Sequence, residues 1–365
     1  MRIRHFLTLF SAVLAIGCGG GGTPGTGGTG STDQSTRDYV ATQQPGDVWS
    51  WTLSPTTFSG TNETLNHTYS GSVEVLASGF SLLTIDSSND GNVAVGSKAY
   101  AVEVPGTCTL VRPAGGQTAM PIIGTGLGAS PTTDTLSMNW ITVPKNNFQI
   151  AMDDAFGVAN FTKSGNGYDV AIDFGRLDYE SGALEAGMGA TLKDSDGRYI
   201  VVNPDGSSVN ENGSDIVFGL QASGVFMADK GPGEGGIIGM VVPTNPLTWS
   251  EVASKNYIGM LVKTGRSQLV SCKPGQVADT MDGVGLFTDD EIATGVSTDE
   301  TRGVTISLIG EISPGMFTVG LRSKDVGAPN EQMYCIAGMV DGKVIMFAFG
   351  GTQKDGTYNV FFVEK

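Results

Sequence analysis

Short apolar runs, often alternating with polar residues, follow one another along most of this chain. Alternation with a period of two is typical of half-buried β-strands, and sustained helical periodicity is nearly absent. The pattern therefore predicts an all-β protein, with WSEVASK before Asn256 as the one short helix. The clearest strand candidates are DVWSWTLS, GSVEVLA, FSLLTID, AYAVEV, YDVAIDFG, RYIVVN, GVTISLIG and FTVGLR.

Asp-Gly pairs separate several of these runs. This dipeptide supplies the positive φ angles that tight hairpin turns need, so each pair predicts a hairpin between antiparallel strands. The pairs are Asp90-Gly91, Asp196-Gly197, Asp205-Gly206, Asp341-Gly342 and Asp355-Gly356.

Two pairs of stretches resemble each other within the chain. The stretch from Ile141 matches the stretch from Met240: a strand, a proline, two aromatics around a short link, and a strand ending Lys-Ser/Thr-Gly. Farther on, the stretch from Ile216 matches that from Tyr334, and a stretch from Met120 reads as a third copy of this ending. Such internal repetition predicts repeated structural units.

The repeats predict three β modules, near 45–144, 145–243 and 244–365. Each of the last two holds about eight expected strands, which suits a small closed antiparallel barrel of the lipocalin-like kind. Modules made of two packed sheets, as in β-sandwiches, are the competing arrangement.

The N-terminal segment has a different pattern. Arg2 and Arg4 precede an apolar run that ends at Ile16, the order found in secretory signal peptides, and the run is too short to span a bilayer as a helix. It continues into Leu-Ala-Ile-Gly-Cys, which resembles the lipobox of bacterial lipoproteins. That resemblance implies removal of residues 1–17 and acylation of Cys18, with palmitate among the chains. Gly19, in place of Asp, resembles the sorting pattern for the outer membrane.

Glycines follow Cys18 in a run that ends in Thr, Pro and Ser. A phosphate-binding glycine loop needs a strand before it and a helix after it, and neither is predicted here. A tract of this composition behaves as a flexible coil. Residues 18–44 are therefore predicted to be a lipidated cysteine and a tether.

Composition and charge restrict the kinds of partner that the chain can bind. The chain holds 54 Gly, is 39% hydrophobic, and carries a formal charge of −16 from 21 basic and 37 acidic residues. Loss of Arg2 and Arg4 with the signal would leave 19 basic residues. So acidic a surface is repelled by nucleic acid and by anionic headgroups, so neither is an expected partner. The remaining candidates are the membrane through the lipid anchor, and an envelope protein or polysaccharide.

Three cysteines remain besides Cys18, in a compartment where disulfides persist. Cys272 and Cys335 both fall in the last module, so a disulfide between them is predicted. Cys108 is left without an intramolecular partner.

No catalytic residue emerges, and the chain is predicted not to be an enzyme. His67 is the one histidine outside the signal, and HExxH, GxSxG and CxxC motifs are absent. Lys263-Thr264-Gly265 matches one element of penicillin-recognising enzymes, but no lysine lies three residues after a serine. No cofactor motif is present. His67 is interpreted as a polar residue of a hairpin.

Two acidic segments are weak calcium candidates. Asp86 and Asp90 occupy the first and fifth positions of a calcium-loop pattern, but Ser97 stands where its final glutamate belongs. Asp289 and Asp290 belong to a second acidic cluster. Both segments are interpreted as turns or solvated loops, so no metal site is predicted.

Trp49 and Trp51 share one face of an expected strand, where they form either part of the core or a stacking surface for sugar, and the core is favoured.

Three functions remain open. The first is an outer-membrane or surface-anchored lipoprotein, periplasmic or cell-surface, whose modules bind a protein or surface polymer. The alternatives are a lipocalin-like carrier of a small apolar ligand and an envelope hydrolase that uses carboxylates.

Overall fold

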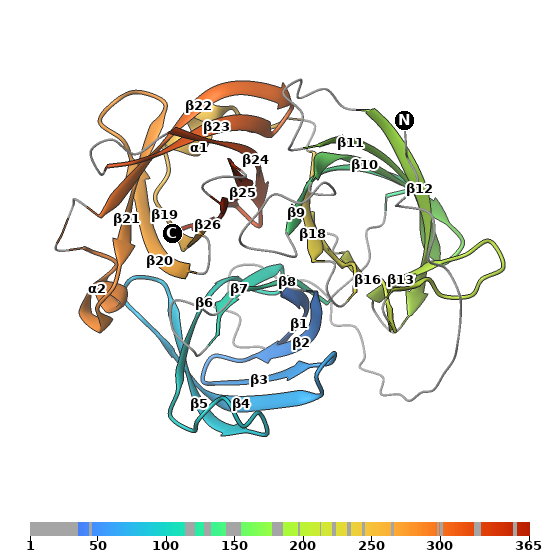
Figure 1. Ribbon diagram of the computed structural model, residues 1–365, viewed down its shortest axis with the longest axis horizontal. Helices are drawn as coiled ribbons and strands as arrows, with labels where there is room; N and C mark the ends of the chain where they lie inside the picture. Colours follow the sequence, from blue (N-terminus) through green and yellow to red (C-terminus); the bar gives the residue numbers. More distant parts are fainter. Residues whose placement is uncertain are drawn as a thin grey trace.

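The protein folds into three closed antiparallel β-barrels in tandem (Figure 1). In each barrel every strand pairs with the strand before it, and the last pairs with the first. Barrels rather than sandwiches are therefore the architecture. This computed structural model describes residues 36–43, 46–113, 121–127, 133–143, 155–176, 185–195, 198–211, 213–220, 224–231, 235–242, 245–263, 266–297, 299, 302–324, 330–352 and 356–365.

Each barrel has eight strands. The first barrel comprises β1 (Arg37–Gln43), β2 (Asp47–Leu53), β3 (Thr57–Asn62), β4 (His67–Val75), β5 (Ser81–Ser88), β6 (Lys98–Val104), β7 (Cys108–Arg112) and β8 (Ile122–Gly126). The second comprises β9 (Thr135–Val143), β10 (Ala155–Ser164), β11 (Gly167–Arg176), β12 (Glu185–Ser195), β13 (Arg198–Val202), β16 (Val217–Leu220), β17 (Val225–Asp229) and β18 (Gly236–Val241). A small hairpin, β14 (Asn210–Glu211) and β15 (Ser214–Asp215), projects from it.

The third barrel comprises β19 (Tyr257–Lys263), β20 (Arg266–Pro274), β21 (Thr280–Leu286), β22 (Gly303–Ser313), β23 (Met316–Ser323), β24 (Asn330–Val340), β25 (Lys343–Thr352) and β26 (Gly356–Glu364). Helix α1 (Trp249–Ala253) precedes it, where a short helix was expected, and packs Trp249 and Val252 into the interior of the barrel. Helix α2 (Asp289–Thr294) lies in the β21–β22 connection. Both helices begin with a capping box, at Thr248 and Thr288.

The observed barrels begin earlier in the chain than two of the module boundaries expected from the sequence. β1 begins at Arg37, inside the segment expected to be linker, and β9 belongs to the second barrel although it ends before residue 144. One of the repeats agrees with the topology: β16–β17–β18 and β24–β25–β26 are the last three strands of their barrels. The repeat that begins at Ile141 and Met240 does not occupy equivalent positions in the two barrels. Its second strand is β10, the second strand of the second barrel, in one copy and β19, the first strand of the third barrel, in the other. The stretch from Met120 contains β8 and β9, which belong to different barrels.

The three barrels close into a ring (Figure 1). β1 and β8 of the first barrel lie against β16 and β17 of the second, and β9 and β18 of the second lie against β24 and β25 of the third. β26 of the third barrel returns to β6 of the first. In each case the eighth strand of one barrel meets the sixth or seventh strand of the next. This is the head-to-tail contact by which a cyclic trimer closes, here within one chain.

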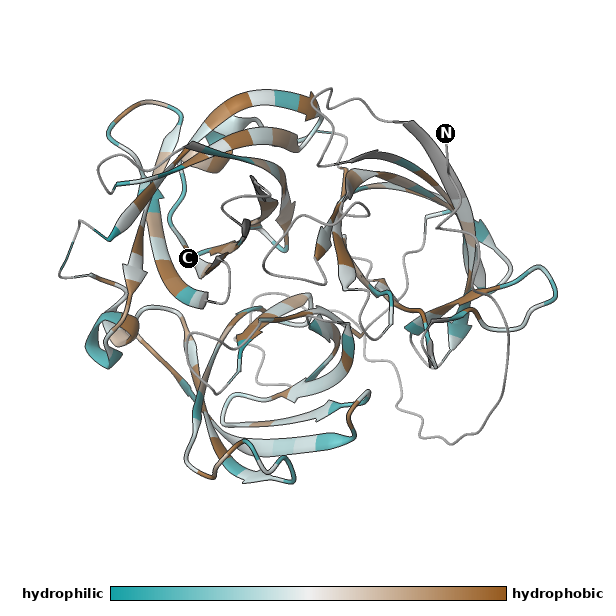
Figure 2. Ribbon diagram, viewed as in Figure 1, coloured by the Kyte–Doolittle hydropathy of each residue, from teal (hydrophilic) through white to brown (hydrophobic). Residues whose placement is uncertain are grey.

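Where the barrels meet, their strands are buried on both faces. In β25, Val344, Met346 and Ala348 point into the third barrel, whereas Ile345 and Phe347 belong to an apolar cluster shared by all three barrels, the central core. Strands of the outer walls expose one face to solvent, and the residues of β4 are mostly hydrophilic or neutral (Figure 2). Other members of the central core include Tyr100, Val102, Leu110, Ile141, Phe156, Met240, Ile258 and Tyr334.

Candidate functional site

The interiors of the barrels are occupied by their own side chains. Trp49 and Trp51 stack with ring centroids 5.7 Å apart inside the first barrel and are 5% and 4% exposed. They are core residues, as favoured from the sequence, and do not present a flat surface to a sugar. The interiors of the other two barrels contain the buried side chains Met138, Phe161, Tyr168, Tyr199, Phe226, Trp249, Tyr257, Met281, Phe317, Met346 and Phe362.

The predicted disulfide between Cys272 and Cys335 is wrong, because both residues, like Cys108, are buried free thiols. Cys272 lies on β20 and Cys335 on β24, four strands apart in either direction around an eight-stranded barrel. Strands spaced about 4.8 Å apart place opposite walls well beyond the roughly 7 Å between Cα atoms that a disulfide can bridge. Burial raises the pKa of Cys108 and Cys272 to about 12, so these thiols are not nucleophiles at neutral pH.

Of the calcium candidates of the first barrel, Asp90 stabilises a turn and Asp86 lies in β5. Asp90 accepts hydrogen bonds from the Asn92 backbone N–H (2.9 Å) and the Tyr69 hydroxyl (2.8 Å). His67 Nδ1 lies 3.6 Å from Asp90, in the strand after a hairpin, consistent with the polar role expected for it. Asp86 is exposed. Its side chain is not brought to Asp90 by any described contact.

The second calcium candidate forms the start of α2, at the junction of the first and third barrels. Asp289 accepts hydrogen bonds from Lys98 (3.1 Å) and from the Tyr100 hydroxyl (3.3 Å), both in β6. Asp290 is exposed. The buried Glu291 pairs with Arg302, 3.2 Å away. Lys98 and Arg302 therefore neutralise two members of this acidic cluster, and within the described ranges no three His, Cys, Asp or Glu side chains form a group suited to a metal ion.

A buried carboxyl joins the first two barrels. Asp229 of β17 is 0% exposed and accepts hydrogen bonds from the Thr42 hydroxyl of β1 (2.5 Å) and the Gly231 backbone N–H (2.8 Å). Burial raises its pKa to about 6, and the two hydrogen bonds only partly oppose that rise. The group is structural, because it lies between packed barrels and not in an open site.

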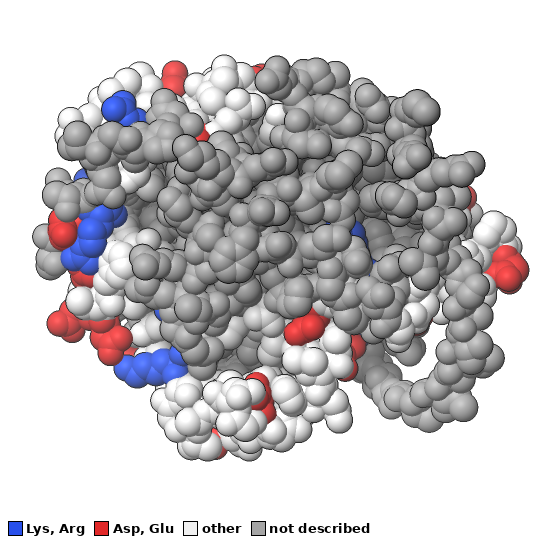
Figure 3. All heavy atoms as spheres, in the orientation of Figure 1, with Lys and Arg blue, Asp and Glu red and all other residues white. Residues whose placement is uncertain are grey.

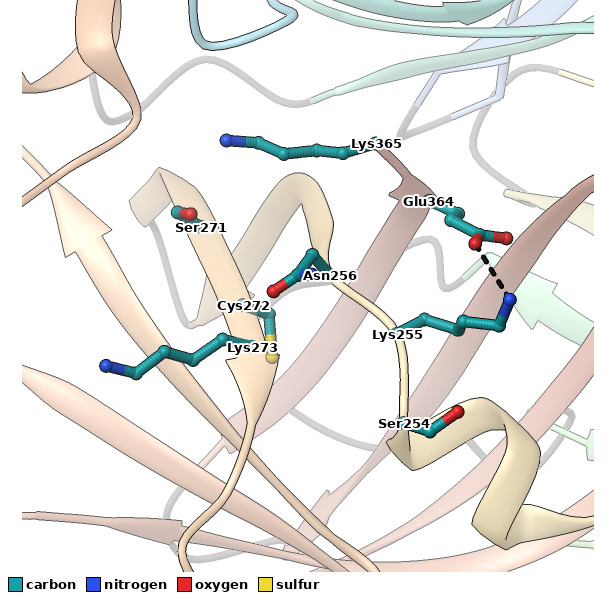
Figure 4. Close-up of a pocket in the computed structure, with 8 residues that line it drawn as sticks. All are labelled: Ser254, Lys255, Asn256, Ser271, Cys272, Lys273, Glu364 and Lys365. Carbon is teal, nitrogen blue, oxygen red and sulfur yellow. Dashed lines mark ion pairs between the residues drawn. The ribbon is translucent and has the colours of Figure 1, made fainter.

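One pocket, of about 380 Å³, opens beside the α1 end of the third barrel (Figure 4). Three segments distant in sequence line it: residues 254–256 after α1, residues 271–273 at the end of β20, and residues 364–365 at the end of β26. Pairing of Tyr257 with Cys272 and with Glu364 brings these segments together. We call this site the lysine pocket, after Lys255, Lys273 and Lys365 in its wall.

Hydrogen-bond donors predominate in the lysine pocket. Its one carboxylate side chain, Glu364, is paired with Lys255 at 3.0 Å and also accepts a hydrogen bond from the Val344 backbone N–H (2.8 Å). Burial raises the pKa of Glu364, but these two contacts outweigh that effect and lower it overall. Sequence analysis did not find this site, since no motif links segments so far apart.

No protein-family model, curated protein or solved structure matches this chain. Cys18 and the signal segment lie outside the described residues. Among the residues that are described, no helix is long and apolar enough to cross a membrane.

Proposed function

We propose that this chain is a lipid-anchored binding protein of the bacterial cell envelope, in which the three-barrel body binds an envelope protein or a surface polymer. The filled barrel interiors carry this proposal. Large buried side chains occupy all three interiors, so a partner has to bind on the outer walls or at the barrel ends. Because only the outer surface of the barrels is accessible, the fold suits recognition of a macromolecule.

The anchor and the charge support the same function. The lipobox resemblance at Cys18 implies attachment to a membrane, and about twenty residues of Gly-rich chain separate it from β1. The acidic balance disfavours nucleic acid. On the face drawn in Figure 3, described acidic and basic side chains are mixed along the rim near β21 and α2.

Two alternatives from the sequence have less support. A lipocalin-like carrier needs a hollow barrel, whereas aromatic rings stack within the first barrel and α1 packs into the third. A hydrolase with paired carboxylates needs two free acids across a cleft. Arg302, Lys98, Lys255 and the Gly231 backbone N–H instead engage the carboxylates of Glu291, Asp289, Glu364 and Asp229, respectively.

Fractionation and crosslinking test the proposal. The native chain should pellet with the outer membrane of a Gram-negative host, and Cys18→Ala should remove it from that fraction. Crosslinking on intact cells should then yield a discrete adduct of the native chain. Equal pelleting of both forms would contradict the anchor. Native mass spectrometry that finds a bound apolar molecule of a few hundred daltons would favour the carrier.

A further inference from the structure

We propose that the lysine pocket at the α1 end of the third barrel binds the oxyanion group of an acidic sugar, such as a sugar phosphate. The proposal adds a ligand class to the envelope-binding function and rests on it only for the source of the ligand. The site itself follows from its geometry and its charges.

The charge of the pocket is opposite to that of the chain. The side chains of its wall, three ammonium groups and one carboxylate, carry a net charge of +2, and the α-carboxylate of Lys365 reduces the total to +1, whereas the whole chain carries −16. The carboxylate of Glu364 does not repel an anion as a free acid would, because Lys255 neutralises it at 3.0 Å. Lys273 and Lys365 are then the lysines of the wall that pair with no described carboxylate side chain.

The remaining donors are uncommitted. Within the part of the chain that the structure describes, the side chains of Lys273, Lys365, Asn256 and Ser271 have no hydrogen-bond partner, although all four line the pocket. Ser254 donates to the Glu251 carbonyl and contributes little. Figure 4 shows Asn256 between the Lys255–Glu364 pair and the β20 residues Ser271 and Lys273. Ammonium, amide and hydroxyl donors together are the groups that bind phosphate or carboxylate oxygens.

The walls are ordered by the barrel. Residues 271–273 and 364 are parts of β20 and β26, which flank β19, and the Lys365 backbone N–H donates to the Asn256 carbonyl at 2.9 Å. α1 is fixed beside them, since the Tyr257 hydroxyl donates to the Val252 carbonyl at 2.6 Å. A volume of about 380 Å³ lies at the lower end of the roughly 300–1,000 Å³ of small-molecule sites. It accommodates a monosaccharide with its oxyanion.

Calorimetric titration of the chain from Gly19 onward, which contains every described strand, tests the site. Inorganic phosphate and glucose 6-phosphate are the probes, and glucose is the neutral control, all at pH 7 and low salt. We expect one site per chain for both anions, weaker binding as salt rises, and no heat from glucose. The absence of phosphate binding would overturn the proposal.

A double variant, Lys273→Gln with Lys365→Gln, removes the charges of both lysines and leaves the Lys255–Glu364 pair intact. Its affinity for both anions should fall by roughly tenfold or more, the equivalent of one lost charged hydrogen bond. The matched control is Lys163→Gln, an exposed lysine of β10 in the second barrel. Both proteins should keep the thermal midpoint of the wild type, because these lysines are exposed. Equal losses in both would indicate diffuse attraction and overturn the site.

The two proposals fail separately. If the anions bind but Cys18→Ala does not change the location of the protein, the pocket stands and the envelope function fails. If Cys18→Ala releases the protein but neither anion binds, the envelope function stands and the pocket proposal fails. If phosphate binds as tightly as glucose 6-phosphate, the site recognises the free anion, and the sugar part of the proposal is wrong.

Discussion

The inner and outer walls of the same barrels have different chemistry. Strands near the ring centre, such as β24 and β25, are apolar on both faces, because one face lines a barrel and the other lines the central core. Outer strands such as β4 and β22 expose much of their length. Because the central core joins all three barrels, we expect them to unfold as one unit, with the inner walls supplying most of the stability.

The largest effect is expected in the central core. Phe347 of β25 is 3% exposed, with its ring 5.8 Å from that of Phe361. Phe347→Ala should cost about 3–5 kcal/mol of unfolding free energy, through lost burial and a cavity. Ile309→Ala on the outer wall of β22, where Ile309 is 59% exposed, should change it by less than about 0.5 kcal/mol. Denaturant unfolding measures both. Similar losses would abolish the distinction between the walls.

The same experiment shows whether the barrels unfold together. If the central core couples them, Phe347→Ala should shift one cooperative transition for the whole body. If the third barrel folds by itself, that variant should split the curve into two transitions. Circular dichroism and tryptophan fluorescence, which reports on Trp49 and Trp51 in the first barrel, Trp140 in the second and Trp249 in the third, should follow one coincident transition in the first case and two transitions in the second.

Asp229 is a titratable carboxyl buried in the inner wall, so its contribution to the unfolding free energy should depend on pH. Its pKa is about 6 in the folded protein against an ordinary 3.8, so the folded state holds the extra proton between these values. Stability contributed at this site therefore falls as pH rises from about 4 to about 6, and stays lower above that. Asp229→Asn should be more stable than the wild type at pH 7 by about 1–3 kcal/mol, and the difference should shrink toward pH 4.

The expected gain rests on the contacts of the amide. Its oxygen can still accept from the Gly231 backbone N–H, and the Thr42 hydroxyl can accept from its NH2 group. Thermal unfolding of both proteins from pH 4 to pH 8 measures the difference. A constant gap across that range would mean that Asp229 does not titrate there.

Glycine in the interior of the first barrel should be less replaceable than glycine on an outer wall. A Cβ on Gly60 would lie 2.2 Å from the Trp51 ring, whereas a Cβ on Gly310 would meet nothing within 4 Å. Gly60→Ala should cost about 1–3 kcal/mol by overpacking. Gly310→Ala should be neutral, or stabilising by up to about 1 kcal/mol through the unfolded chain. Denaturant midpoints compare the two, and the same sign for both would refute the close packing at Trp51.

Local sequence patterns were enough to predict most of the strands and the all-β fold. Alternation predicted strands, and Asp341-Gly342 forms the two-residue hairpin expected of it, with φ angles of 49° and 77°. Asp90-Gly91 does not form such a hairpin, because residues 89–97 make a longer β5–β6 connection held by the Asp90 side chain. Turn chemistry is local, but the length of a connection depends on what the strands pack against.

Properties that depend on strand order were not predictable. Cys272 and Cys335 share a module in sequence but lie on opposite walls of a barrel, and the lysine pocket unites three distant segments. The continuous apolar stretch of β25 was a readable signal of burial on both faces, and thus of contact between barrels. Which barrel would cover it depends on shape complementarity across the ring, which a linear pattern does not encode.

The smallest effect is expected at an ion pair on the outer rim between two barrels. Arg198 of β13 contacts both carboxylate oxygens of Glu63 in the first barrel, at 2.6 and 2.8 Å, with the two side chains 26% and 34% exposed. Solvent screens such a pair, so Arg198→Ala should cost about 0.2–1 kcal/mol, and less at high salt. Glu63→Gln should give a similar loss, and the double variant no more than either alone, because all three remove one interaction. Denaturant unfolding of the wild type and the three variants at two salt concentrations provides these free energies. A loss comparable to that of Phe347→Ala would show that the rim, and not the central core, holds the first two barrels together.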